Sequence, residues 1–544
     1  MRVMKNFILM LTISNLFSNV YAFQWSEEFI TIPEKTNYTQ TSTHKDVMNF
    51  VNAAKTKSTL VHVETIATSL EGRAVPMLVL ANPQITSPAE ADASGKPVIY
   101  LQGNIHVGVV EGKEALMILM REILFGDKKD LLSNQILLIT PIYNSDGNDK
   151  MAEGNRRSQA GSPKLAGSRA NGQGFDLNRD GMKLEALETQ GLMKNVILKW
   201  DPELFVDLHT TNGSWHGYSL TYAPSYHSAG FPSTSDYTMN TMLPEITKQI
   251  KNKFNLDMYL YGGFRLRQGW PPKTWRTYNH HPRYLVNQFG LRNKMAILSE
   301  TFAHDPFYKR IHSVYAFALG IIEYTNEYGH DMMKINKEAE KATIRSVLND
   351  AGKTRKGVRF KMVAMDQTFT LRAYKYEPFT NSNGEINYLR KGEIVDVPGV
   401  QNFSKFEAEK QSTLPRGYLF SSSIEPIAEI LRRHGVKVER LKKAVRAIGE
   451  EFIVEQFDQN SRKFEGHNMA TISGTYSDKT REFHPGSYKV DLAQPLANLI
   501  FYLLEPESDD GLVAWNYFDE YLISRNVKTA KVVYPVFKYF EIEE

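Results

Sequence analysis

Short apolar runs alternate with amphipathic stretches along residues 45–324. Within 111–124, apolar side chains such as Ala115, Leu119 and Ile123 recur at the spacing of a helix. The run over 136–142 is apolar except for Thr140, as in a buried strand. The whole pattern predicts strands at 60–66, 75–80, 97–101, 136–142, 204–208 and 295–298, and helices at 45–55, 111–124 and 310–324. Strands that alternate with helices favour an α/β fold built around a sheet.

The pattern changes after a highly charged, helical stretch at 332–354. Beyond it we expect strands over 358–373, a helix over 424–438 and a helical stretch that ends at Leu504. A chain of 544 residues is also too long for one ordinary core. We therefore place a domain boundary near residue 340 and predict a main domain over 23–340, followed by a smaller α+β accessory domain over 341–544.

The N-terminus has the pattern of a secretory signal peptide. Arg2 and Lys5 precede an apolar stretch at 7–17, and small or tolerated residues lead to a cleavage site after Ala22. The stretch is too short to cross a bilayer core of about 30 Å. We expect a secreted or periplasmic protein that has no membrane span once residues 1–22 are removed.

Composition restricts the chemistry that is open to the chain. It contains no cysteine, so a bound metal would need His, Asp or Glu ligands. The net charge is +4, and no basic run interleaves with aromatic residues, so nucleic acid is not an expected partner. The sequence leaves the oligomeric state open.

Three of the predicted strands end near an ionisable residue: His106, His209 and Glu300. Catalytic groups gather at the carboxyl ends of strands in open α/β sheets. Imidazole is a good zinc ligand, and catalytic zinc usually has three protein ligands and a water molecule. A nearby carboxylate can take a proton from that water and pass it to a leaving group.

Four ordered motifs, Gly103–Glu114, Phe175–Asp180, Asp207–His209 and Ser299–Thr301, resemble those of the zinc carboxypeptidases, the M14 metallopeptidase family. The resemblance covers roughly residues 35–330. It implies a mixed, mostly parallel sheet flanked by helices, a Zn²⁺ cofactor, and hydrolysis of peptide or peptide-like amides near a free carboxylate. It also implies that His106 and His209 are zinc ligands and that Glu300 is the catalytic glutamate.

The resemblance also assigns residues that would bind the substrate. Asn178 and Arg179 match the pair that grips the terminal carboxylate, to which a guanidinium binds in a bidentate, charge-assisted way. Arg157, with Arg156 as a close alternative, matches the arginine that stabilises the oxyanion. Spacing from the catalytic glutamate favours Tyr278 over Tyr284 as the substrate-side tyrosine.

One position departs from the family pattern. The family motif is His-x-x-Glu with both end residues as metal ligands, but the third residue after His106 is Val109, which has no lone pair. Glu111 could stand in only after a local rearrangement, because two residues turn a helix by about 200°. We expect zinc-dependent hydrolysis of the metallocarboxypeptidase type, which Val109 could impair. A disabled enzyme that binds peptide C-termini or cell-wall peptides is one alternative, and an N-acyl amino acid deacylase, which the sequence 207–211 also resembles, is another.

Overall fold

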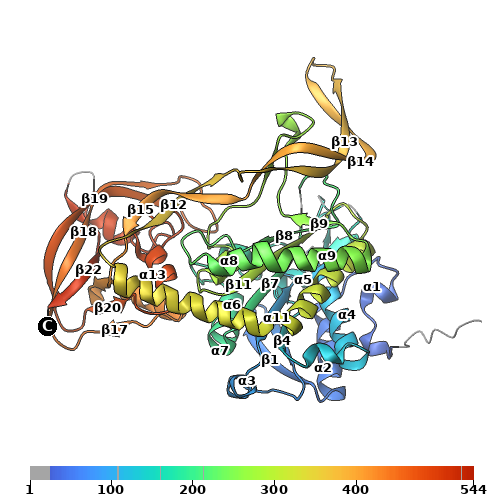
Figure 1. Ribbon diagram of the computed structural model, residues 1–544, viewed down its shortest axis with the longest axis horizontal. Coiled ribbons are helices and arrows are strands. Elements are labelled where there is room, and N and C mark those ends of the chain that lie inside the picture. The colour runs from blue at the N-terminus through green and yellow to red at the C-terminus, as the bar shows by residue number, and fades with distance from the viewer. Residues whose placement is uncertain are drawn as a thin grey trace, which may run out of the picture.

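The computed structural model describes residues 25–106, 109–157, 159, 161–211, 213–527 and 530–543. The predicted signal peptide and its cleavage site lie outside these residues. An eight-stranded sheet forms the centre, in the order β1-β2-β4-β3-β7-β11-β8-β9 (Figure 1). Its strands are β1 (Val61–Thr68), β2 (Ala74–Leu80), β3 (Val98–Gly103), β4 (Ile136–Thr140), β7 (Leu204–Thr210), β8 (Leu220–Pro224), β9 (Met258–Leu260) and β11 (Met295–Thr301).

The middle of this sheet is parallel and its flanks are mixed. Strands β4, β3, β7 and β11 run parallel to one another, whereas β1, β2 and β4 are joined by antiparallel pairs and β8 is antiparallel to β11. The mixed α/β fold expected from the sequence is therefore confirmed, and the strands that carry the predicted site residues are neighbours.

Both faces of the sheet are covered, which explains why the central strands β3 and β4 are buried along their whole length and begin with apolar runs. On one face Leu101, Ile139 and Val206 pack under α2 (His44–Lys57), α4 (Glu111–Phe125), α9 (Leu243–Phe254) and α11 (Phe307–Asp350). On the other face Tyr100 and Phe205 join a core that continues into the C-terminal region. Shorter helices complete this part: α1 (Ile32–Lys35), α3 (Pro88–Ser94), α5 (Ser145–Asp149), α6 (Leu187–Leu192), α7 (Leu198–Trp200), α8 (Ser233–Tyr237) and α10 (Leu285–Gly290).

The C-terminal region is rich in strands and lies at one end of the molecule (Figure 1). A second sheet has the order β17-β20-β16-β22-β18-β19, with β21 beside β18. Its elements are β16 (Gly417–Phe420), β17 (Glu439–Arg440), β18 (Val445–Gln459), β19 (Ala470–Phe483), β20 (Tyr488–Asp491), β21 (Val532–Val533) and β22 (Val536–Glu543), with α12 (Glu425–Arg433), α13 (Ala497–Leu504) and α14 (Asp519–Ser524).

Two further strand pairs connect the parts. Strand β12 (Arg355–Val363) pairs with β15 (Lys405–Thr413), and the long hairpin of β13 (Thr368–Thr380) and β14 (Ile386–Phe403) projects from the molecule (Figure 1). The base of β14 pairs in parallel with β10 (Thr274–Arg276), in the segment between β9 and α10. A small pair, β5 (Ala152–Glu153) with β6 (Leu165–Ala166), lies in the polar loop after α5.

The boundary predicted near residue 340 falls inside α11, which runs without a break from Phe307 to Asp350. The two helical stretches expected at 310–324 and 332–354 are one helix. The division into two domains therefore stays a prediction. No helix among the described residues is long and apolar enough to cross a membrane.

Candidate functional site

The structure brings the predicted chemical residues together in one cavity of about 190 Å³. In the parallel pair of β7 and β11, Glu300 lies directly opposite His209, and His106 follows the neighbouring strand β3. The ring centroids of His106 and His209 are 5.1 Å apart. The cavity is lined by His106, Val109, Arg156, Arg169, Asn178, Arg179, His209, Thr210, Tyr261, Tyr278, Tyr284, Val286, Leu298 and Glu300.

Asp176 orients the first imidazole. Nε2 of His106 and Oδ1 of Asp176 are 2.7 Å apart. Because an ionised carboxylate only accepts hydrogen bonds, Nε2 carries the proton and Nδ1 keeps its lone pair. The other carboxylate oxygen, Oδ2, accepts two hydrogen bonds from Arg169, at 2.9 and 2.7 Å from Nε and Nη2. Sequence reasoning did not single out Asp176.

Asp207 lies at ion-pair distance from the second imidazole. Residues 207 and 209 point to the same side of β7 because side chains alternate along a strand. Oδ2 of Asp207 lies 2.9 Å from Nε2 of His209. Gln102 on β3 donates to the other oxygen of Asp207 at 3.3 Å. The contact between Asp207 and His209 lacks the geometry of a hydrogen bond, so Asp207 acts on the ring mainly through its charge.

The pKa values of the two imidazoles shift in opposite directions. Burial lowers the pKa of His106 to about 3, despite the opposing effect of Asp176, so this ring is neutral at physiological pH. Burial also disfavours the charged form of His209, but the charges of Asp207 and Glu300 outweigh it and the pKa of His209 is raised. Burial likewise disfavours ionisation of Asp176, yet His106, Arg179 and Arg169 keep its pKa well below the usual range.

Glu300 has the protonation behaviour of an acid–base group. Burial raises its pKa to about 7, while His209 and Arg169 oppose the shift. A carboxyl group with a pKa near the working pH can both accept and return a proton. The side chain lines the cavity beside His209 and is therefore within reach of a bound ligand.

Asn178 and Arg179 lie in a short 3₁₀ turn, Leu177–Arg179, at the cavity wall. Oδ1 of Asn178 accepts from the backbone N–H of Leu285 at 3.1 Å, and the guanidinium of Arg179 stacks on Tyr284 at 4.6 Å from the ring centroid. These contacts hold both side chains in place. Arg179 donates to the carbonyl oxygen of Asn178 at 2.7 Å.

Both tyrosines considered from the sequence line the cavity. Tyr278 donates from its hydroxyl to Oδ1 of Asn287 at 3.0 Å, and burial raises its pKa well above the usual value. Tyr284 instead covers Arg179. The rings of the two tyrosines meet edge to face at 5.2 Å, so they form one wall.

The structure places the two adjacent arginines differently. Arg156 lines the cavity, whereas Arg157, which the family resemblance favoured, is exposed and lies outside the cavity wall. Consecutive side chains of a turn point in different directions, which the sequence alone does not resolve. Burial lowers the pKa of Arg156 to about 10, so it stays charged at neutral pH.

Arg169 is the clearest residue that the sequence analysis missed. It lines the cavity and its guanidinium grips Asp176 with two hydrogen bonds. Its loop folds back on itself through the β5–β6 pair. The available signal was an arginine shortly before the Asp176–Arg179 motif, in a loop too long to be a simple connection.

The position of the missing metal ligand is filled by an apolar side chain. Val109 is 2% exposed and lines the cavity. Glu111 is not part of the cavity lining: its carboxylate pairs with Arg310 at 3.0 Å and accepts from Thr210 at 2.7 Å. The structure thus places the stand-in ligand in a buried ion pair rather than beside the two imidazoles.

The residues present do not complete a catalytic zinc site. His106 and His209 offer two imidazole nitrogens, but among the described residues no third His, Asp or Glu donor groups with both of them within 4.8 Å. Catalytic zinc usually has three protein ligands. The cavity therefore keeps two of the expected ligands, and Val109 blocks the position of the third.

Comparisons with known proteins find similarity to carboxypeptidases. Residues 47–263 match the family model of the zinc carboxypeptidases. Carboxypeptidase 2 of Trichophyton rubrum is 23% identical over 514 residues, which cover 87% of this chain and 84% of that protein. Carboxypeptidase D of Mus musculus is 30% identical over 134 residues, covering 22% of this chain and 10% of that protein.

Solved structures give weaker likenesses. A metallo-carboxypeptidase from Burkholderia cenocepacia is 15% identical with a TM-score of 0.39, over 52% of this chain and 69% of that chain. A metallo-carboxypeptidase from Pseudomonas aeruginosa, solved with (2-guanidinoethylmercapto)succinic acid, is 16% identical with a TM-score of 0.36, over 53% of this chain and 69% of that chain.

Proposed function

Because this chain belongs to the zinc carboxypeptidase family through residues 47–263, we propose that its cavity binds peptides or peptide-like amides by their free carboxylate. We further propose that hydrolysis by this chain is strongly impaired. One observation carries the proposal. The cavity is lined by polar side chains suited to a carboxylate and a carbonyl group, but Val109 lies beside the two imidazoles; the polar side chains are Arg156, Arg169, Asn178 and Arg179.

The charges in the cavity support the binding of an anionic ligand. Arg156, Arg169 and Arg179 line a small space in which Glu300 is the one acid among the lining residues. Asn178 and Arg179 would hold the terminal carboxylate, because a guanidinium matches its two oxygens. Arg156 and Arg169 would contact the carbonyl oxygen of the last amide and stabilise negative charge there.

The surroundings leave room for the rest of a chain. A second hollow shares Tyr261 and Tyr278 with the cavity and is also lined by Thr211, His216 and Arg276. It continues into a larger hollow of about 670 Å³ beside Tyr376 of strand β13. Residues that precede the C-terminal one would lie along this path.

Glu300 would be the proton-transfer group, since its pKa near 7 suits both directions of transfer. In an intact site of this family, zinc would supply a polarised carbonyl and an activated water. The donors of this chain do not fit that requirement, so the residues support binding and proton transfer but not efficient cleavage. Val109 is also the specific observation that favours a ligand-binding role without turnover.

Zinc content per chain tests the metal part of the proposal. Purified parent protein and a Val109→Glu variant are dialysed against low micromolar zinc and analysed by mass spectrometry. Both carry His281→Ala, because the donor atoms of His280, His281 and Asp509 lie within 4.8 Å of one another and could also bind zinc. We expect about one zinc in the glutamate variant and far less in the parent. A parent with stoichiometric zinc lost on His106→Ala would contradict the proposal.

The raised pKa of Glu300 predicts a pH-dependent effect on stability. A carboxyl group whose pKa rises on folding, here from 4.5 to about 7, stabilises the folded state at low pH, and this stabilisation is lost as pH rises between the two values. We therefore compare the unfolding free energy of Glu300→Gln with that of the parent at each pH. The variant's advantage is expected to be about 2 kcal/mol larger at pH 8 than at pH 5.

Urea unfolding of both proteins at pH 5 and pH 8 measures this difference. A difference between parent and variant that is the same at both pH values would show that Glu300 titrates normally and is not poised for proton transfer.

A further inference from the structure

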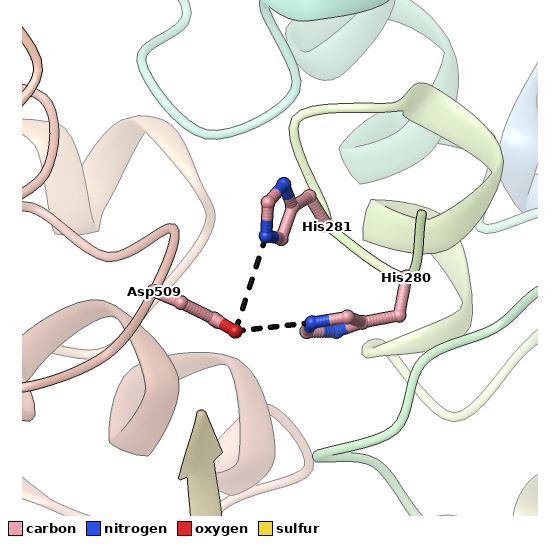
Figure 2. Close-up of side chains that lie close together, drawn as sticks. All are labelled: His280, His281 and Asp509. Carbon is pink, nitrogen blue, oxygen red and sulfur yellow. Dashed lines mark hydrogen bonds and ion pairs between the residues drawn. The ribbon is translucent and has the colours of Figure 1, made fainter. Parts of the chain in front are cut away.

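A second cluster of potential metal ligands lies outside the cavity. It consists of His280 and His281, in the segment between β10 and α10, and Asp509, in the turn after α13 (Figure 2). Their donor atoms all lie within 4.8 Å of one another, and no other group of three among the described residues meets this condition. The cluster joins two segments that are far apart in the sequence.

The distances suit a shared ion. Nε2 of His280 and Nε2 of His281 lie 3.1 and 3.9 Å from Oδ2 of Asp509. Bonds of 2.0–2.2 Å from a tetrahedral zinc to nitrogen and oxygen place two ligands about 3.3–3.5 Å apart. The two observed distances lie on either side of this value, so small side-chain movements would bring all three donors onto one ion.

The side chains are held in position before any ion binds. Oδ2 of Asp509 accepts from the backbone N–H of Phe360 at 3.1 Å, and Oδ1 accepts from the hydroxyl of Tyr502. The ring of His280 is 2% exposed and packs 4.9 Å from the ring of Phe360 and 5.2 Å from that of Phe406. His281 is partly exposed, which gives the cluster an opening to solvent.

The local charge favours a cation. The neighbouring guanidinium of Arg283 binds Asp510, at 2.6 Å from Nη2 and 2.8 Å from Nε, and not Asp509. The Arg283–Asp510 pair is neutral as a unit. The carboxylate of Asp509 brings a negative charge to the cluster, which a divalent ion would offset.

We propose that His280, His281 and Asp509 form a transition-metal site that ties the C-terminal region to the segment carrying Tyr278 and Tyr284. Two imidazoles and one carboxylate match zinc best, with a water molecule as the fourth ligand. Both tyrosines line the cavity, so an ion bound to the same segment would restrict the movement of this wall of the ligand-binding site. This proposal does not depend on whether the cavity hydrolyses or only binds its ligand.

Cobalt binding tests the site, because tetrahedral Co²⁺ has intense visible absorption bands. The full-length mature protein is titrated with Co²⁺ as parent, His281→Ala and Asp509→Asn, with His106→Ala as the matched control in the cavity. We expect one cobalt per chain in the parent and in His106→Ala. The affinity for Co²⁺ should fall by more than about 100-fold in His281→Ala and Asp509→Asn. This exceeds the 10–100-fold loss that is typical when a residue contacting a metal ligand, and not the metal itself, is mutated.

A thermal melt of each protein gives a second readout, because an ion that binds only the folded state raises the melting temperature. Zinc should raise it in the parent and His106→Ala but not in His281→Ala. Bands and a melting shift that disappear in His106→Ala but persist in His281→Ala would assign the metal to the cavity and overturn the proposal. So would the absence of tetrahedral bands in the parent.

Discussion

Val109→Glu is expected to raise kcat/KM for peptides with a free C-terminus by more than about 100-fold when zinc is present. Mutating a residue that only contacts a metal ligand typically lowers metal affinity or activity by 10–100-fold, and restoring a ligand itself should have a larger effect. Val109 is buried and lines the cavity beside His106 and His209. A glutamate there supplies the third donor, and Glu300 and the arginines already line the same space. Release of the C-terminal amino acid, followed by chromatography, measures the gain.

Val109→Gln is the matched control, because it has the size of glutamate without its charge. It should show no gain. The double variant Val109→Glu/Glu300→Gln should also lose the gain, since it restores the metal ligand but removes the proton-transfer group. If Val109→Glu bound zinc and stayed inactive, the assignment of the surrounding residues would be wrong. If the parent were already as active as Val109→Glu, Val109 would not impair the site.

Arg179→Gln is expected to weaken binding of a peptide with a free C-terminus by about 10–100-fold, since each hydrogen bond to a charged group contributes about 1.5–3 kcal/mol. The guanidinium is held against Tyr284 and beside Asn178, so its position is set before the ligand arrives. Calorimetry with a short peptide measures the loss. Affinity for the C-terminal amide of the same peptide should change little.

Arg157→Gln is the control for charge alone. It removes the same charge from a nearby exposed position that does not line the cavity, and its effect on affinity should stay below about twofold. Equal losses in both variants would mean that the ligand responds to the general positive field of the loop and not to a defined carboxylate site.

The strands of the central sheet were predictable because both of their faces are buried. Residues 136–139 and 204–206 are apolar for this reason, and the polar residues that follow them in β4 and β7 marked the end of each apolar run. The ordered motifs identified His106, His209, Glu300, Asn178 and Arg179, and the structure brings all five to one cavity.

Other features depend on contacts that the sequence does not encode locally. The charged residues after Met332 lie largely on the exposed side of α11, so a composition change that suggested a boundary is the solvated continuation of one helix. Arg156, Arg157 and Arg169 belong to a loop whose path is set by the β5–β6 pair. The contact of His280 and His281 with Asp509 joins segments more than two hundred residues apart, and only folding brings it about.

The most direct test of the account is the binding of one peptide, as free acid and as C-terminal amide, to the parent protein after dialysis against a chelator. We expect the free acid to bind and the amide to bind at least about tenfold more weakly, because Asn178 and Arg179 need no metal to hold a carboxylate. Equal binding of both peptides, or binding of the free acid that appears only after zinc is returned, would contradict the central claim that this chain keeps a carboxylate-binding cavity beside an incomplete metal site.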